Sequence, residues 1–133
     1  MQVRDGMSPE VLTIGPDHTL REASRAMAAR RVGAAVVHDM DGAGVGIITE
    51  RDVLASVGGG QDPDSEHVRD HVSVDLVYAA PTWTLEQAAV AMVRGGFRHL
   101  VVLDRGEVAG ILSVRDIVRC WSADREAAAV PPG

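Results

Sequence analysis

One residue pattern occurs twice along this chain in the same order, and this duplication constrains the fold more than any other feature. The copies open with the same tripeptide, Val-Arg-Asp, at Val3 and again at Val68. The later matches are Thr19-Leu20 with Thr84-Leu85, Ala23 with Ala88, Met27 with Met92, Val36-Val37 with Val101-Val102, and residues 46–52 with residues 110–116. A register that persists over half a chain indicates two copies of one structural unit.

Each copy has the hydrophobic pattern of a β-α-β-β-α unit. An extended piece leads through a proline to an amphipathic helix, and two apolar runs of strand length precede a closing helix. The expected segments of the first copy are Val11–Ile14, a helix from Leu20 capped by Thr19, Ala34–Val37, Val45–Ile48 and Arg51–Val57. Those of the second are Leu76–Ala79, a helix from Leu85 capped by Thr84, Leu100–Leu103, Val108–Leu112 and Arg115–Trp121.

The fold class predicted from these segments is mixed α/β (α+β), with two tandem repeats. The turns between the paired strands fall at Asp41-Gly42 and at Arg105-Gly106. We expect repeat 1 with the start of a glycine-rich linker at 1–60, repeat 2 at 61–123 and a flexible tail at 124–133. A repeat of this size is marginal alone, so we expect its apolar surface to pack against its twin.

Composition excludes several classes of function. The formal net charge of −6 argues against a nucleic-acid binder or an anionic-membrane binder. The chain has no lysine, which excludes Schiff-base chemistry and a phosphate-loop lysine. Cys120 is the only cysteine, so neither an internal disulfide nor a cysteine-rich metal site is expected. The chain opens without an apolar signal region, and a cytoplasmic location is therefore expected.

The pattern hydroxyl-x-x-Asp occurs at both predicted strand-to-helix junctions, as Thr49 with Asp52 and as Ser113 with Asp116. One interpretation is a capping box, in which the two side chains bond each other's backbone N–H groups. The other is a ribose site, because a carboxylate accepts two hydrogen bonds from a 2′,3′-diol. The two interpretations are compatible, since the hydroxyl can cap the helix while the carboxylate holds a sugar.

These residues together resemble a tandem pair of cystathionine-β-synthase (CBS) domains, also called a Bateman module. The resemblance covers Val3 to Trp121 and is carried by Val-Arg-Asp, Thr-Leu-x-x-Ala, Val-Val-x-Asp and Gly-Ile-x-Thr/Ser-x-x-Asp, each present twice. It implies a non-catalytic regulatory module with its repeats related by a pseudo-two-fold axis. It also implies two clefts that bind AMP, ADP, ATP or S-adenosylmethionine, and a homodimer.

The resemblance implies that each ligand is shared between repeats. By position, one site has its adenine beside His18, Ala23, Val32 and Gly33, its ribose on Ser113 and Asp116, and its phosphate near Arg98 and His99. The other has its adenine beside Trp83, Ala88 and Phe97, and its ribose on Thr49 and Asp52. The counterparts of Arg98 and His99 are Gly33 and Ala34, which carry no charge. Unequal occupancy of the two sites is therefore expected.

Several of these residues have a second interpretation. Arg98 and His99 also fit ordinary strand-edge positions with solvated side chains. His67 and His71 have the spacing of metal ligands, but no third ligand accompanies them, so a solvated face is expected and no metal.

The expected function is an adenine-nucleotide sensor that requires no cofactor and has AMP, ADP or ATP as its regulatory ligand. The alternatives are a partner-docking or structural module with empty clefts, and a sensor of S-adenosylmethionine or NAD. No enzymatic motif is present, and the sequence does not name the regulated protein partner.

Overall fold

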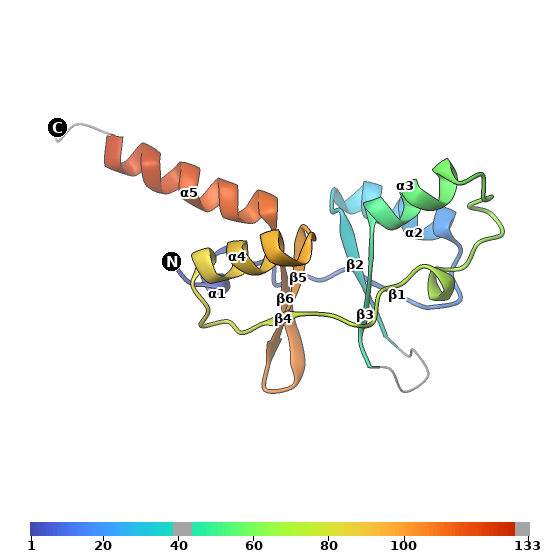
Figure 1. Cartoon of the computed structure of the whole chain (residues 1–133), viewed down its shortest axis with the longest axis horizontal. Helices are drawn as coiled ribbons and strands as arrows, with labels where there is room; N and C mark the ends of the chain where they lie inside the picture. Colours follow the sequence, from blue (N-terminus) through green and yellow to red (C-terminus); the bar gives the residue numbers. More distant parts are fainter. Residues whose placement is uncertain (39–43, 130–133) are drawn as a thin grey trace. The chain divides into compact units, whose positions relative to one another are not determined.

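The computed structural model describes residues 1–38 and 44–129, and the chain has the predicted mixed α+β fold. The polypeptide divides into two compact units (Figure 1). We call residues Val11–Leu76 the Asp52 unit, and Met1–Glu10 together with the chain from Val77 onward the Asp116 unit. Each contains a three-stranded sheet.

The Asp52 unit has the predicted β-α-β-β-α order. Its elements are β1 (Thr13–Ile14), α2 (Leu20–Arg30), β2 (Ala34–Val37), β3 (Gly46–Thr49), α3 (Glu50–Gly58) and the 3-10 helix η1 (Val68–Asp70). Strand β2 is central, parallel to β1 and antiparallel to β3. All four of its residues are buried, which explains its uninterrupted apolar sequence. The predicted turn at Asp41-Gly42 lies outside the described residues.

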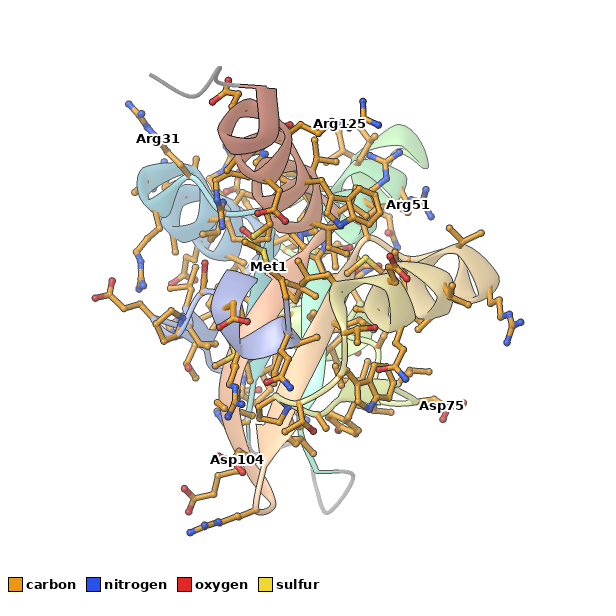
Figure 2. All side chains as sticks on the ribbon, turned by 90° about the vertical axis from the view of Figure 1, so that its left-hand side faces the viewer. Met1, Arg31, Arg51, Asp75, Asp104 and Arg125 are labelled. Atoms are coloured by element: carbon orange, nitrogen blue, oxygen red, sulfur yellow. The ribbon has the colours of Figure 1, made fainter. Side chains whose placement is uncertain are left out.

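The Asp116 unit repeats this order with longer strands. Its elements are α1 (Val3–Gly6), β4 (Tyr78–Ala79), α4 (Leu85–Gly95), β5 (His99–Asp104), β6 (Glu107–Ser113) and α5 (Val114–Ala129). Strand β5 is parallel to β4 and antiparallel to β6. The predicted turn joins β5 to β6, with positive φ at Arg105 and Gly106, and Asp104 lies at this end of the hairpin (Figure 2).

The first long helix of each unit begins at the predicted cap. Thr19 accepts the backbone N–H of Glu22 before α2, and Thr84 accepts that of Gln87 before α4. In both cases the side chain of the third helical residue accepts the backbone N–H of the cap threonine, which completes a capping box. Arg31 ends α2 in the left-handed region and lies at the tip of that helix (Figure 2).

Each unit has its own hydrophobic core. That of the Asp52 unit includes Leu20, Ala23, Met27, Val37 and Ile48. The equivalent positions in the Asp116 unit are Leu85, Ala88, Met92, Val102 and Leu112. The apolar positions that recur in the sequence therefore form equivalent parts of two separate cores, as the sequence pattern predicts.

The opening segment of each sequence copy packs in the unit formed mainly by the other copy. Val3 is fully buried in the core of the Asp116 unit, and its N–H donates to the carbonyl of Trp83 at 2.7 Å. Val68 is fully buried in the core of the Asp52 unit, and its N–H donates to the carbonyl of His18 at 2.8 Å. The compact units therefore do not coincide with the sequence copies at 1–60 and 61–123.

Helix α5 continues to Ala129, through the first part of the segment expected to be a flexible tail. Alanine, glutamate and arginine favour helix, and this stretch contains no glycine or proline before residue 130. Residues 130–133 lie outside the described part of the chain. No helix within the described residues has the length and apolar character that a membrane span requires.

Candidate ribose-binding junctions

Strand β3 passes directly into helix α3 at the first hydroxyl-x-x-Asp motif. The Thr49 hydroxyl oxygen accepts the Asp52 N–H at 3.4 Å, and Asp52 Oδ2 accepts the Thr49 N–H at 2.8 Å. The Thr49 hydroxyl also donates to Asp52 Oδ2 at 3.0 Å. Within residues 1–38 and 44–129, no hydrogen bond reaches Asp52 Oδ1. Asp52 is half-buried, so one carboxylate oxygen holds the cap and the other can accept a ligand.

Strand β6 passes into α5 with the same backbone device. Asp116 Oδ2 accepts the Ser113 N–H at 2.8 Å, and the Ser113 hydroxyl oxygen accepts the Asp116 N–H at 3.1 Å. The capping interpretation is therefore confirmed at both junctions. Asp116 differs from Asp52 in that its Oδ1 accepts from Arg119 Nη1 at 2.9 Å. Asp116 is 7% exposed, and this ion pair compensates part of its buried charge.

A carboxylate has acceptor positions beyond those used here. Its two oxygens present about four lone-pair sites, and the hydrogen bonds from Ser113 and Arg119 to Asp116 occupy half of them. The remaining sites are enough for the two hydroxyls of a diol. Both junctions therefore combine a satisfied helix cap with unused acceptor capacity, which is compatible with ribose binding.

The candidate phosphate residues lie beside the Asp116 junction. His99 is the cross-strand partner of Ser113, so their side chains share one face of the sheet. The Arg98 carbonyl accepts the N–H of Val114, the first residue of α5, at 2.9 Å, and the Arg98 side chain is exposed. Serine, carboxylate, imidazole and guanidinium groups are thus contributed by adjoining segments of one unit.

The Asp52 junction has the same backbone arrangement without these cations. Ala34 is the cross-strand partner of Thr49, and the Gly33 carbonyl accepts the Glu50 N–H at 2.9 Å. Gly33-Ala34 and Arg98-His99, which the sequence comparison matches, therefore occupy equivalent positions in the two units. The charge difference predicted between the two junctions is present at structurally equivalent positions.

Two candidate adenine residues of the Asp116 unit line an open groove of about 840 Å³. Trp83 precedes α4 and Phe97 follows it, and the groove runs along that helix past Gln87, Val90 and Arg94. The Phe97 ring lies against the end of α4, where a Cβ at Gly95 would approach it to 1.9 Å. Gly95 is needed for this position of Phe97, and sequence reasoning did not single it out.

The candidate adenine residues of the Asp52 unit lie at both ends of α2. His18 precedes the helix, is exposed, and has its Nδ1 3.1 Å from Glu22 Oε2. Hydrogen bonds from the Thr19 backbone N–H and then from His18 hold the pKa of Glu22 below its usual value. Val32 and Gly33 follow the helix and present exposed and partly exposed surface.

Two of the predicted contact residues present no surface. Ala23 and Ala88 are 0% exposed and form part of the cores beneath α2 and α4. An alanine at this position fills the helix-sheet interface, so ligand contact would require that packing to open. Their recurrence in both copies follows from this structural role.

The predicted residues are therefore distributed between the two units. His18, Val32, Gly33, Thr49 and Asp52 belong to the Asp52 unit. Trp83, Phe97, Arg98, His99, Ser113 and Asp116 belong to the Asp116 unit. Sequence reasoning missed Arg119, although its position three residues after Asp116 on a helix is the spacing of an ion pair.

His67 and His71, which have the spacing of metal ligands, flank η1. An ion-pair partner within the chain occupies the side chain of His71. His71 Nε2 lies 2.8 Å from Glu66 Oε1, and both side chains are largely buried. Among the described residues, no group of three His, Cys, Asp or Glu side chains has metal-binding geometry.

Comparison with known proteins agrees with the repeated fold. The family model described as CBS domain matches residues 2–59 and 68–122. The CBS domain-containing protein YhcV of Bacillus subtilis is 32% identical over 116 residues, covering 86% of this chain and 81% of YhcV. Other curated relatives are longer, and the chain spans 43% of one from Methanocaldococcus jannaschii and 20% of one from Arabidopsis thaliana.

Solved structures share this fold. The CBS-domain containing protein ATU1752 from Agrobacterium tumefaciens has a TM-score of 0.81 at 34% identity, covering 90% of this chain and 92% of that one. The CBS domain pair of protein MJ0100, solved with 5′-methylthioadenosine and S-adenosyl-L-methionine, has a TM-score of 0.82 at 20% identity, covering 93% and 98%. The two matched segments, the two β-α-β-β-α units and these likenesses establish that the chain belongs to the CBS domain family and contains a pair of CBS domains.

Proposed function

We propose that this CBS pair is a non-catalytic regulatory module that binds an adenine nucleotide, with Asp52 and Asp116 as ribose acceptors. The observation that carries the proposal is the duplicated strand-to-helix junction. At each junction a carboxylate completes a helix cap and retains lone pairs for a diol. A CBS domain pair of similar fold, that of protein MJ0100, was solved with 5′-methylthioadenosine and S-adenosyl-L-methionine, which supports a ligand with a ribose.

The chemistry of the Asp116 junction favours a nucleotide with a phosphate. The N-terminus of α5 carries partial positive charge, and His99 is paired across the sheet with Ser113 at the start of that helix. Arg98 adds an exposed guanidinium one residue earlier, which can fork onto phosphate oxygens. AMP, ADP and ATP share the ribose and phosphate groups that this combination recognises.

The ligands of a related fold support the adenosine part of the proposal. Protein MJ0100 was solved with two ligands that share an adenosine group and differ in the substituent on its 5′ carbon. Neither of them carries a phosphate. S-adenosylmethionine therefore remains the alternative ligand for this chain. It differs from AMP, ADP and ATP in the charge of its 5′ substituent, which is cationic where theirs is anionic.

The second candidate function is a partner-docking module without a ligand. The exposed helix residues favour it, since Val93 on α4 and Val118 and Trp121 on α5 leave apolar surface uncovered. Helices α4 and α5 contact each other in one unit, so these side chains belong to neighbouring helices (Figure 1). We propose that a second copy of the chain covers this surface in a homodimer, because an isologous contact is the commonest way to bury such a face.

Thermal melting with a ligand panel separates the two candidates. A ligand that binds the folded state at a hundredfold excess over its Kd stabilises the protein by about 2.7 kcal/mol. We expect AMP, ADP or ATP to raise Tm, and inosine monophosphate to do so less. No change with any nucleotide, NAD or S-adenosylmethionine would leave the docking function, for which light scattering should give twice 14.1 kDa.

A further inference from the structure

The two junctions differ at the third residue after the aspartate. Arg119 occupies this position in the Asp116 unit, and its Nη1 donates to Asp116 Oδ1 at 2.9 Å. Its Nη2 also donates to the Gly6 carbonyl at 3.3 Å, so the guanidinium is held between α5 and α1. The equivalent residue in the Asp52 unit is Ala55, which carries no charge and is exposed.

Other cations near the junctions do not create this difference. Arg51 and Arg115 each precede their aspartate by one residue, so they occupy equivalent positions in the two units. Both aspartates also lie in the first turn of a helix of at least nine residues, and both complete the same cap. Glu50 in the first turn of α3 corresponds to the uncharged Val114 of α5. The closing helices therefore differ near their aspartates by this additional carboxylate in the Asp52 unit and by Arg119, the one that bonds the aspartate directly, in the Asp116 unit.

The charge of the ribose acceptor affects which adenosine ligand binds. The 2′,3′-diol and the 5′ substituent belong to one sugar, so a carboxylate bonded to the diol lies within about a Debye length, 8 Å, of that substituent. An uncompensated carboxylate repels a 5′-phosphate and attracts a cationic group. A carboxylate paired with arginine presents less net charge and tolerates the phosphate.

We propose that Arg119 is a specificity-determining positioning residue that makes the Asp116 junction favour adenosine ligands with an anionic 5′ group. The Asp52 junction, with Ala55 in its place, favours neutral or cationic adenosine ligands. This inference rests on the proposed function, because it assigns ligand classes to the same two carboxylates. It deepens that function by predicting that one chain distinguishes two ligand classes at its two junctions.

Calorimetric titration with AMP and adenosine tests the inference, and the quantity of interest is the ratio of their affinities. Asp52→Ala serves as the parent, so that the Asp116 junction is measured. Arg119→Gln in this parent should lower the affinity for AMP by about twofold to fivefold, the range of an exposed ion pair, and change that for adenosine less. The difference should shrink at high salt, because screening weakens the interaction with the phosphate.

Two further variants separate charge from structure. Arg119→Lys keeps the positive charge and should retain most of the AMP preference, even where its melting temperature falls with the loss of the Gly6 contact. Ala55→Arg adds a cation at an exposed position, and with Asp116→Ala as the parent it should raise AMP affinity relative to adenosine.

The outcomes distinguish this inference from the function on which it rests. Wild-type protein that binds neither AMP, adenosine nor S-adenosylmethionine would overturn both. Binding with an AMP-to-adenosine ratio unchanged by Arg119→Gln, or lowered equally by Arg119→Lys, would overturn the role of Arg119 alone. A lowered ratio that lysine restores would support it.

Discussion

The Asp52 unit and the Asp116 unit have the same succession of elements and the same capped junction, but their side chains near that junction differ. The backbone bonds correspond one to one, as in the donation from Glu50 to the Gly33 carbonyl and from Val114 to the Arg98 carbonyl. The charged groups do not correspond, since the positions of His99 and Arg119 are occupied by Ala34 and Ala55 in the other unit. Duplication thus retained what builds the junction, and divergence changed the electrostatics around it.

The opening segments of the two copies form a second comparison. Both place a fully buried valine in the core of a unit. The segment around Val68 is additionally linked by ion pairs, including Arg69 to Asp17 at 2.7 Å and Arg21 to Asp64. Because these ion pairs are exposed, we attribute the attachment of this segment mainly to the buried valine and the backbone bonds.

The largest expected effect on the free energy of unfolding concerns these valines. Val3→Ala and Val68→Ala should each lower the free energy of unfolding by about 2 kcal/mol, because two buried methyl groups are lost and a cavity remains. Denaturant unfolding followed by circular dichroism measures both. Val93→Ala is the control, since Val93 is 83% exposed. A loss at Val3 no larger than at Val93 would contradict the burial of the first segment.

A smaller effect is expected at the helix caps. Thr49→Ala and Ser113→Ala should each cost about 1 kcal/mol of stability, because each leaves a helix N–H without its side-chain acceptor. Thr49→Ser and Ser113→Thr keep the hydroxyl and should cost less. The same unfolding measurement applies, and equal stability of the alanine and hydroxyl variants would contradict the capping role.

The smallest effect is the contribution of His99 to the pH dependence of AMP binding, which the Asp52 junction lacks because Ala34 occupies the equivalent position. Histidine side chains gain a proton near neutral pH, and a protonated imidazole binds phosphate better than a neutral one. AMP affinity should therefore rise as pH falls from about 8 to 6. The phosphate also titrates in this range, so His99→Gln is the control. A pH profile that His99→Gln leaves unchanged would exclude His99 from the phosphate site.

The sequence predicted the repeated elements well because their signals are local or periodic. Thr19 and Thr84 are caps that act within one helical turn, and Leu20 and Leu85 begin helices with regular apolar spacing. The packing of Val3 and Val68 in the unit formed mainly by the other copy was not predicted. A tripeptide alone does not indicate which distant segment of the chain it will contact. The extension of α5 was missed because an alanine-rich end was interpreted as a tail.

The candidate site could be predicted only in part for a related reason. The two carboxylates and His99 were found because duplication made their matches and mismatches visible. Ala23 and Ala88 were also selected by duplication, but their recurrence reflects a buried helix-sheet contact. The pairing of Arg119 with Asp116 and the space that Gly95 leaves for Phe97 depend on three-dimensional contacts that a repeat comparison does not reveal.

The central claim is that the two aspartates bind ribose in addition to capping helices, and calorimetric titration of AMP into Asp116→Ala tests it most directly. Loss of charge-assisted bonds to the diol should weaken binding at that junction by about 1.5–3 kcal/mol, while 2′-deoxy-AMP should bind the wild type less well than AMP. Melting curves recorded in parallel should show a loss of stability of only about 1 kcal/mol. AMP affinity unchanged by Asp116→Ala, together with a lowered melting temperature, would contradict the claim and leave Asp116 as a helix cap alone.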